Sequence, residues 1–380
     1  MSDAGHPTRF VHFLPTFPQR GGTGVLVQGL VDAGRRQGRD DEVVSYRRGH
    51  VDGSLPAVPL PTRLLMSSPV PLPFVPDVVA DRLLGPGAPG ALVLHGVFTP
   101  SCSRLSMEVG RRRPDVAVVA DPHDAYDEGL FGTRTAVKRA YWAGIERPYL
   151  RRVDVIVVAA PSHADRLGRL GVATTTLVVP PGLSPADAAR AVEVAAARGR
   201  RPAAPRLQLL ALGRWDVHEK GIDLLCEAAD DPSLRPHVRV RLVGPEVGAR
   251  SEIEALLRRH RLDNFEAVGY VDDVWPELLA ADALVLPSRK EGFGLVALQA
   301  LASGLPVLLS TAAGMAEYVE DGRGVVLVRP TAPAVRAGLH ELVDRQPQLA
   351  AAAQAASSRF ALEFTCDRVM DRLADVLARS

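Results

Sequence analysis

The fold of this sequence is decided by the stretch Leu207-Gln208-Leu209-Leu210-Ala211-Leu212-Gly213-Arg214. Its first six residues form a nearly continuous apolar run, which is typical of a strand buried on both faces of a parallel sheet. A glycine and an arginine then follow at the carboxyl end of that strand, where open α/β sheets bind their ligands. The stretch therefore predicts an α/β domain with a ligand site at the edge of its sheet.

Comparable apolar runs occur in both halves of the chain. They cover residues 10–14, 91–95, 116–119 and 155–158 in the first half, and 207–212, 238–243, 283–286 and 306–309 in the second. Segments with helical spacing of apolar residues lie between several of them, for example 25–31 and 134–150. This alternation is typical of Rossmann-like α/β domains, and 380 residues suffice for two of them.

The domain boundaries follow from breaks in this pattern. We place the N-terminal domain at 1–183 and the C-terminal domain at 206–360, with a final helical segment at 361–380. A linker is expected at 184–205, because Pro180-Pro181-Gly182 ends the last strand of the first half and residues 198–205 add Arg, Gly and Pro without periodicity.

The bulk properties exclude several classes of protein. Lys and Arg number 45 against 44 Asp and Glu, and a net charge of +1 argues against a dedicated nucleic-acid binder. Cys102, Cys226 and Cys366 show no Cys-x-x-Cys pairing, which argues against a disulfide framework and a structural zinc site. The sequence opens without a secretion-signal pattern and contains no apolar stretch long enough to span a membrane. We therefore expect a cytoplasmic protein.

Two elements of the C-terminal domain predict a phosphate site. Arg214 and Lys220 place two cations near the end of one strand, where Arg can grip phosphate oxygens bidentately and Lys supplies a point charge. The sequence Glu291-Gly292-Phe293-Gly294-Leu295 precedes a helix expected at 295–302. Its glycines allow backbone N–H groups to approach an anion at the start of that helix. Together the two elements predict a clamp for a diphosphate leaving group.

Taken in order along the chain, the motifs resemble glycosyltransferase family 4 over nearly its whole length. The matching pieces are Gly21-Gly22-Thr23-Gly24, residues 156–167, Pro180-Pro181-Gly182, Gly213-Arg214, Lys220-Gly221, Val243-Gly244-Pro245, Val268-Gly269-Tyr270-Val271, Pro287-Ser288 and Glu291-Gly292-Phe293-Gly294-Leu295. The resemblance implies the GT-B architecture, an α/β fold in which two Rossmann-like domains with parallel sheets face a central cleft. It also implies that the final helix crosses back to the N-terminal domain.

The resemblance further implies roles for individual residues. Arg214 and Lys220 would hold the diphosphate, and Glu291 would contact hydroxyls of the donor sugar. The other donor-binding positions are Gly22, Thr23, Gly213, Gly244, Tyr270, Val271, Gly292, Phe293, Gly294, Leu295 and Gln299. Of these, the first two would close over the donor from the N-terminal domain. Gln299 departs from the family, which commonly has a second glutamate eight residues after the first.

A histidine at a strand end is the remaining candidate. His123, in Asp121-Pro122-His123, resembles the position at which the family keeps an active-site histidine in its acceptor domain, and His95 is a rival for the same role. The family reaction keeps the anomeric configuration. In a route often proposed for it, the departing phosphate takes the acceptor proton, so that His123 would position the acceptor and remain un-ionised.

We therefore predict a retaining glycosyltransferase that transfers a hexosyl group from a nucleoside diphosphate sugar to a hydroxyl acceptor. A UDP-sugar is the favoured donor and GDP-mannose is an alternative, while the acceptor is a glycan, a lipid-linked sugar or a small molecule. Apart from the donor, no cofactor is expected. Two other functions remain open: a nucleotide-sugar epimerase, and a catalytically silent nucleotide-sugar-binding protein, which the replacement at Gln299 would suit.

Two further patterns concern metal ions and membranes. Asp121, Asp124, Asp127 and Glu128 are close in sequence, but the chain has no Asp-x-Asp triplet, so we expect a metal-independent enzyme. The segment 134–152 carries six cations and the single acid Glu146. We favour a solvated helix face for this segment, and a peripheral contact with acidic lipid at the inner membrane face is the alternative.

Overall fold

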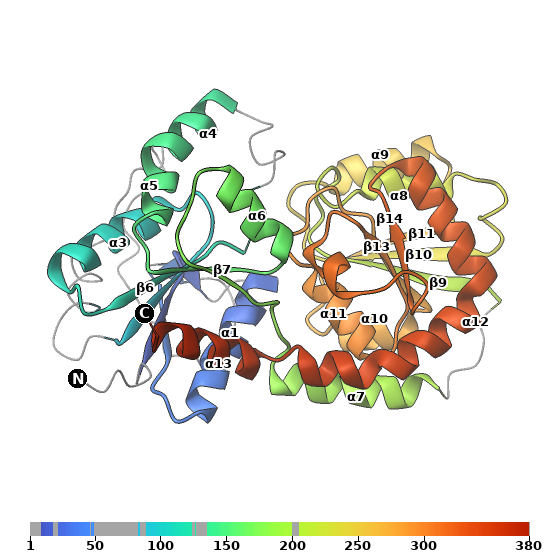
Figure 1. Cartoon of the computed structure of the whole chain (residues 1–380). Coiled ribbons are helices and arrows are strands. Elements are labelled where there is room, and N and C mark those ends of the chain that lie inside the picture. Colours follow the sequence, from blue (N-terminus) through green and yellow to red (C-terminus); the bar gives the residue numbers. More distant parts are fainter. Residues whose placement is uncertain are drawn as a thin grey trace. The chain divides into compact units, whose positions relative to one another are not determined.

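The computed structural model describes residues 9–17, 22–45, 47–48, 83, 89–123, 126, 135–199 and 205–379. The chain divides into two compact units, which we call unit 1 (residues 1–184 and 366–380) and unit 2 (residues 185–365). Each unit is built around one six-stranded sheet whose neighbouring strands are all parallel (Figure 1). Parallel sheets need helical crossovers, and these cover the sheet faces.

The sheet of unit 1 reverses its strand order between β1 and β5. In spatial order its strands are β3 (Glu42–Val44), β1 (Phe10–Phe13), β5 (Ala91–His95), β6 (Ala117–Asp121), β7 (Val155–Val158) and β8 (Thr176–Val178). A separate two-stranded sheet pairs β2 (Thr16–Phe17) with β4 (Arg47–Arg48). The point of reversal is where a doubly wound sheet binds ligands, beyond the carboxyl ends of its strands.

The helices of unit 1 pack on both faces of its sheet. They are α1 (Gly22–Arg36), α3 (Pro100–Arg112), α4 (Thr135–Tyr141), the π-helix η2 (Trp142–Glu146), α5 (Arg147–Leu150), α6 (Pro161–Arg169) and α13 (Cys366–Leu377). One apolar cluster joins α3 and α5 to one sheet face, and a second joins α1 and α13 to the other. Helices α1 and α13 meet at Gly29, where an added Cβ would lie 2.7 Å from Cys366 Sγ.

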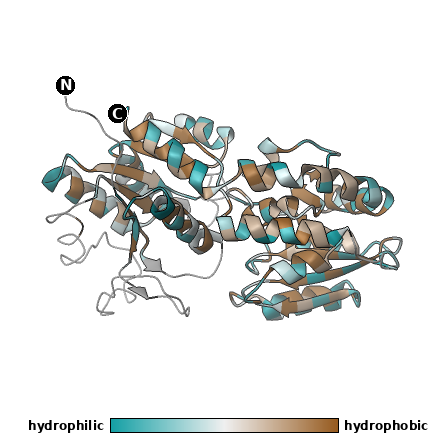
Figure 2. Ribbon diagram, turned by 90° about the horizontal axis from the view of Figure 1, so that it is seen from below, coloured by the Kyte–Doolittle hydropathy of each residue, from teal (hydrophilic) through white to brown (hydrophobic). Residues whose placement is uncertain are grey.

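Unit 2 has the strand order of a dinucleotide-binding sheet, with its reversal between β9 and β12. In spatial order the strands are β11 (Phe265–Gly269), β10 (Val238–Val243), β9 (Leu207–Leu212), β12 (Ala283–Leu286), β13 (Val307–Ser310) and β14 (Val325–Val328). The helices are α7 (Pro185–Arg198), α8 (Ile222–Ala229), α9 (Arg250–Arg259), α10 (Trp275–Ala280), α11 (Leu295–Ala302), the 3-10 helix η3 (Gly314–Tyr318) and α12 (Ala332–Glu363). Figure 2 shows hydrophobic colour along many of the strands, whereas the helices mix hydrophobic and hydrophilic residues.

The eight apolar runs are confirmed as strands β1, β5, β6, β7, β9, β10, β12 and β13, with ends that shift by at most two residues. The helix expected at 295–302 is α11. Strand β8 is the strand expected before Pro180, whereas β3, β11 and β14 were not predicted. Strand β3 has only three residues, and β11 is a half-buried edge strand that contains Glu266, so neither has a long apolar run. Strand β14 is a continuous apolar run, and the pattern at 325–328 was not recognised.

Three boundaries differ from the expectations. Helix α7 occupies most of the range 184–205, because its residues Ala191, Val194 and Ala195 are buried and Arg198 hydrogen-bonds carbonyl oxygens at the ends of α10 and α11. The segment 361–380 is not one helix: α12 ends at Glu363 and α13 begins at Cys366. The glycine loop at 21–24 is a helix start, since Gly22 and Thr23 lie in the first turn of α1, and Gly21 lies outside the described residues.

Candidate functional site

A pocket lies at the point of strand reversal in unit 2, and we call it the β9 pocket. The lining residues come mainly from the ends of β9, β10 and β12 and from the turn before α8; they are Ala211, Leu212, Gly213, Arg214, Trp215, Lys220, Ile222, Leu225, Leu242, Val285, Leu286 and Pro287. The two cations expected from the sequence, Arg214 and Lys220, are therefore part of one otherwise largely apolar lining.

Two glycines allow the backbone segments around this pocket to approach one another. Gly244, just after β10, has φ +146°, and a Cβ added there would lie 1.8 Å from the carbonyl oxygen of Gly213. Gly221 has φ +67°, and a Cβ there would lie 2.3 Å from the carbonyl oxygen of Pro287. Real side chains do not tolerate such distances, so the close packing of these strand ends depends on glycine.

Both cations of the pocket form ion pairs with acidic side chains. Arg214 Nη2 lies 2.9 Å from Glu219 Oε2, and its side chain is still 47% exposed. Lys220 Nζ lies 2.7 Å from Glu291 Oε2 in a less exposed position. Ser288 Oγ donates a longer hydrogen bond of 3.4 Å to the same oxygen of Glu291. A phosphate could take the place of Glu219 on Arg214, because half-exposed ion pairs contribute little to stability.

The segment after Glu291 turns directly into α11. Phe293 is buried, and Gly294 adopts a left-handed conformation with φ +97° immediately before the helix. The carbonyl of Gly294 accepts hydrogen bonds from the N–H groups of Ala297 and Leu298, which closes the first turn. Gln299 lies on α11, and only 7% of it is exposed. The positive end of the helix dipole and Glu291 thus belong to the same strand-to-helix turn, and Glu291 bonds Lys220 of the turn before α8.

Other predicted donor-site residues lie apart from this pocket. Tyr270 and Val271 follow β11 at the edge of the sheet, and Tyr270 is exposed. Neither residue is part of the pocket lining. Gly22 and Thr23 belong to unit 1, in α1. The structure therefore gathers Gly213, Arg214 and Lys220 in the pocket, with Glu291 bonded to the last of them.

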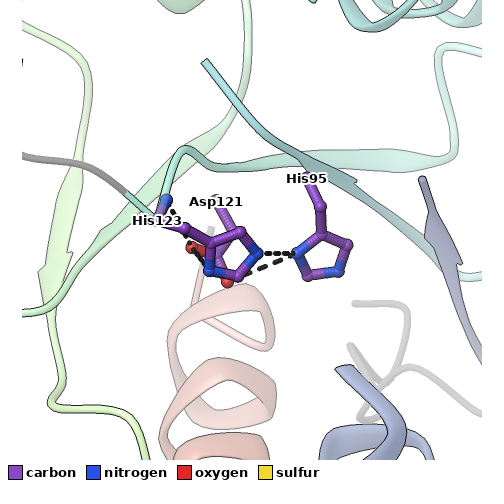
Figure 3. Close-up of side chains that lie close together, drawn as sticks. All are labelled: His95, Asp121 and His123. Atoms are coloured by element: carbon purple, nitrogen blue, oxygen red, sulfur yellow. Dashed lines mark hydrogen bonds and ion pairs between the residues drawn. The ribbon is translucent and has the colours of Figure 1, made fainter. Parts of the chain in front are cut away.

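Unit 1 places three histidines in a row beside its own point of strand reversal, and we call this row the histidine chain. His12 lies on β1, His95 ends β5, and His123 follows β6. His12 Nδ1 is 2.9 Å from His95 Nε2, and His95 Nδ1 is 2.8 Å from His123 Nε2 (Figure 3 shows the second pair). The first two rings are fully buried, and 13% of the His123 side chain is exposed.

Asp121 closes the outer end of the histidine chain. Its Oδ1 lies 3.2 Å from His123 Nδ1, and its Oδ2 lies 3.5 Å from His95 Nδ1. Burial raises the pKa of the Asp121 carboxyl, but the neighbouring His123 and His95 outweigh it, and the net pKa is lowered. Asp121 is therefore a carboxylate that only accepts hydrogen bonds. The backbone N–H of His123 also donates to it, and His123 has a left-handed φ of +57°, which is uncommon for residues other than glycine.

His12, at the inner end, is held neutral. Burial lowers the pKa of His12 well below its usual value, and the positive charge that His95 could carry lowers it further. Its Nε2 is buried and has no hydrogen-bond partner among the described residues. The row therefore runs from a buried nitrogen, which has no described hydrogen-bond partner, to the carboxylate of Asp121 near the surface.

His95, Asp121 and His123 have the residue types of a metal site, but their rings are not oriented as metal ligands. Two imidazoles bound to a tetrahedral zinc ion place their nitrogens roughly 3.3 Å apart, with both lone pairs converging on the ion. Here the nitrogens lie 2.8 Å apart and face one another, which is the geometry of an N–H···N hydrogen bond. The other acids considered for a metal, Asp124, Asp127 and Glu128, lie outside the described residues.

A second buried acid adjoins this region. Glu146 ends the π-helix η2, and its Oε1 accepts hydrogen bonds from Tyr126 Oη at 2.7 Å and from the backbone N–H of Phe98 at 3.0 Å. Burial raises the pKa of the Glu146 carboxyl to about 7. Phe98 and Tyr126 both have left-handed φ angles, of 48° and 46°. Short π-helices and strained residues are frequent at functional sites.

Sequence reasoning missed two residues of this region, and each left a signal. His12 is a polar side chain inside the apolar run 10–14, and Glu146 is the single acid among the cations of 134–152. In that segment Arg139, Arg151 and Arg152 are exposed, and Arg134 lies outside the described residues. Within the described part of the chain, no helix combines the length and apolar character needed to cross a membrane.

Family models match both halves of the chain. Residues 21–182 match the model described as "Glycosyl transferase 4-like domain", and residues 206–345 match "Glycosyl transferases group 1". Among curated relatives, the D-inositol 3-phosphate glycosyltransferase of Geodermatophilus obscurus is 36% identical over 51% of this chain and 46% of its own length. The glycogen synthase of Mycobacterium tuberculosis is 34% identical over 57% of this chain and 53% of its own. The chain thus spans about half the length of these relatives.

Solved structures show the same fold over the whole chain. Sucrose-phosphate synthase from Thermosynechococcus elongatus superimposes with a TM-score of 0.73 at 20% identity, covering 98% of this chain and 100% of the other. HepE from Anabaena, in complex with UDP-glucose, gives a TM-score of 0.73 at 17% identity, covering 99% and 100%. Two Rossmann-like units with this likeness constitute a GT-B fold, and with both family models matched, the chain belongs to the group 1 glycosyltransferases.

Proposed function

We propose that the chain is a retaining glycosyltransferase that transfers a hexosyl group from a nucleoside diphosphate sugar, with a UDP-sugar favoured, to a hydroxyl acceptor. The observation that carries this proposal is the β9 pocket, which combines Arg214 and Lys220 with an apolar lining at a point of strand reversal. Ligand pockets are typically apolar with a few convergent polar groups. The HepE structure with UDP-glucose and the names of the curated relatives support the same function.

The donor side of the mechanism belongs to unit 2. On binding, the diphosphate displaces Glu219 from Arg214 and Glu291 from Lys220, the pairs that hold these cations in the structure. The cations then neutralise the charge that develops on the departing diphosphate, which lowers the barrier because they are already in position. Glu291, released from Lys220, becomes free to accept hydrogen bonds from sugar hydroxyls. The backbone before α11 adds the positive end of its dipole.

The acceptor side belongs to unit 1. His123 is the outer ring of the histidine chain and is partly exposed, so it can bind an acceptor hydroxyl. In a retaining route the departing phosphate takes the acceptor proton, and His123 positions the acceptor without becoming charged. The relatives named D-inositol 3-phosphate glycosyltransferase make a phosphorylated cyclitol one acceptor class to include in a panel, beside glycans and lipid-linked sugars.

A thermal-shift screen with UDP-, GDP- and ADP-glucose and with GDP-mannose tests donor binding, because a ligand that binds only the folded state raises its stability. We expect one nucleotide base to raise the melting temperature, and transfer from that donor to be insensitive to EDTA. Binding without turnover on an acceptor panel would indicate a silent binding protein. Conversion of the donor without an acceptor would indicate an epimerase. If no nucleotide sugar stabilises the protein, the proposal fails.

A further inference from the structure

The histidine chain has a hydrogen-bond order that can be deduced from its two ends. The ring centroids of His95 and His123 are 4.9 Å apart with planes inclined by 5°, and those of His12 and His95 are 5.2 Å apart and inclined by 14°. Because each centroid separation far exceeds the N···N distance, the rings meet edge to edge in nearly one plane. Each contact holds one proton, which only one of the two nitrogens can carry.

Two orders of donation are available to three neutral rings. In the first, every ring carries its proton on Nδ1: His12 donates to His95, His95 to His123, and His123 to Asp121. In the second, every ring carries its proton on Nε2 and donates inward. The second order points a bare nitrogen of His123 at a carboxylate and leaves an N–H of His12 buried without an acceptor. Both features are unfavourable, so the first order prevails.

An additional proton on any of the three rings has the same consequence. The two inter-ring contacts can hold only one proton each, and the contact with Asp121 already holds one. A fourth proton therefore always places an N–H on His12 Nε2, whichever ring carries the charge. That nitrogen is buried and has no partner among the described residues. Because an orphaned buried donor costs free energy, the hydrogen-bond geometry opposes a fourth proton on the three rings.

The charged and titratable groups around the histidine chain also affect how readily its rings take up a fourth proton. Arg39, which pairs with Asp41 beside β1, opposes a positive charge on His12, whereas Asp121 favours one. From the other sheet face, Cys102 of α3 donates a weak hydrogen bond to the backbone oxygen of His95. Tyr149 of α5 interacts electrostatically with Asp121. Among the described groups, Asp121 accepts from the histidine chain, and it lies at the outer end.

We propose that His12 and His95 are positioning residues that lock His123 in its neutral Nδ1–H tautomer, oriented by Asp121. The lock keeps an uncharged imidazole at the surface of unit 1 under conditions in which a solvated histidine would become charged. Its consequence for acceptor binding rests on the proposed function. The tautomer itself is a property of unit 1 and can be measured without any substrate.

The test is ¹⁵N NMR of the full chain with ¹⁵N-labelled histidine rings, titrated between pH 5 and 8. At pH 7 we expect the rings of His12, His95 and His123 all to be neutral Nδ1–H tautomers. Their shared first protonation should fall below that of a solvated histidine, because it places an N–H on His12 Nε2 without an acceptor. An Nε2–H signal from any of the three, or an imidazolium among them at pH 7, would overturn the proposal.

Two substitutions at His12 separate the lock from a general packing effect. His12→Asn places an amide where Nδ1 lay, so its oxygen can accept the His95 Nε2–H that protonation creates; the protonation midpoint should rise by about one pH unit. In His12→Phe, the nitrogen that would carry a proton without an acceptor becomes His95 Nε2. The protonation midpoint should therefore stay low. Equal midpoints in the two variants contradict the lock. His163→Asn, a change at a buried histidine on α6 outside the chain, serves as the control.

Activity gives a second readout that can fail separately. If unit 1 binds the acceptor, the acid limb of the kcat/KM profile should move upward with the NMR midpoint in His12→Asn and stay in place in His12→Phe. An NMR shift without a matching kinetic shift would leave the lock intact and remove His123 from the proposed acceptor site. Should a variant fail to fold, the wild-type tautomer spectrum alone still decides the proposal.

Discussion

The β9 pocket and the histidine chain occupy equivalent places, each at the point where the strand order of a parallel sheet reverses, but they are built differently. In the pocket, Arg214 and Lys220 are long side chains paired with acids that a ligand can displace. In the chain, His12 and His95 are fully buried and fixed by hydrogen bonds of 2.9 and 2.8 Å. The first site is suited to exchanging one anion for another, and the second to holding one group in one protonation state.

The largest expected effect is on stability and concerns Glu146, the second buried acid of unit 1. Its folded-state pKa of about 7 lies above the ordinary glutamate value of 4.5, so the folded state keeps a proton that the unfolded state has lost. The contribution of Glu146 to the unfolding free energy is therefore full below about pH 4.5 and falls by roughly 3 kcal/mol as the pH rises to about 7. Glu146→Gln should remove most of this dependence, since an amide oxygen can still accept from Tyr126 and Phe98.

The measurement is urea unfolding at pH 5 and pH 8, followed by hydrogen exchange within residues 142–150 so that unit 1 is read separately. Glu108→Gln is the control: a hydrogen bond from Arg111 lowers the pKa of Glu108, so this carboxyl is ionised at both pH values and the substitution should leave the difference between pH 5 and pH 8 unchanged. A pH dependence that is the same in wild type and Glu146→Gln would mean that the carboxyl is ionised in the fold.

The next effect concerns the exchangeable cations of the β9 pocket. Arg214→Ala and Lys220→Ala should each lower kcat about a hundredfold or more, because the departing diphosphate loses a preorganised partner. Arg289→Ala is a matched control, as Arg289 pairs bidentately with Asp223 at 2.7 Å and lies outside the pocket lining. Rates within about threefold of wild type in either pocket variant, at saturating donor, would remove that residue from the mechanism.

His123→Ala tests the division of labour between the two sites. Transfer should weaken by at least about tenfold, while affinity for the nucleoside diphosphate stays nearly unchanged, because the nucleotide is assigned to unit 2. Calorimetry with the diphosphate and initial rates with the acceptor measure the two quantities. If His123→Ala loses both transfer and diphosphate affinity, the assignment of His123 to the acceptor side is wrong. The assignment is also wrong if His95→Ala weakens transfer and His123→Ala does not.

The two sites also differ in how far the sequence predicts them. The fold was predicted because its central strands are continuous apolar runs, and the β9 pocket because Gly213-Arg214 and the start of α11 are local motifs at strand ends. The histidine chain joins residues 83 and 28 positions apart. His95 and His123 were therefore treated as rivals, although they are bonded to one another. The register that places His95 opposite Asp121 depends on tertiary pairing, which no local pattern encodes.

The smallest expected effect concerns Gln299, a neutral residue where the resemblance leads one to expect a carboxylate. It lies on α11, beyond the turn that carries Glu291, and only 7% of it is exposed. Charge-assisted hydrogen bonds are roughly twice as strong as neutral ones, so a carboxylate here should hold a ribose hydroxyl more tightly than an amide does. Gln299→Glu should therefore tighten diphosphate binding by about threefold to tenfold, equivalent to roughly 0.6 to 1.4 kcal/mol. Titration of both forms at fixed pH and salt measures this, with Gln208→Glu, a half-buried position outside the pocket lining, as control. Weaker binding by the Glu variant would show that Gln299 donates its amide hydrogen, and that this pocket holds the nucleoside by a different contact.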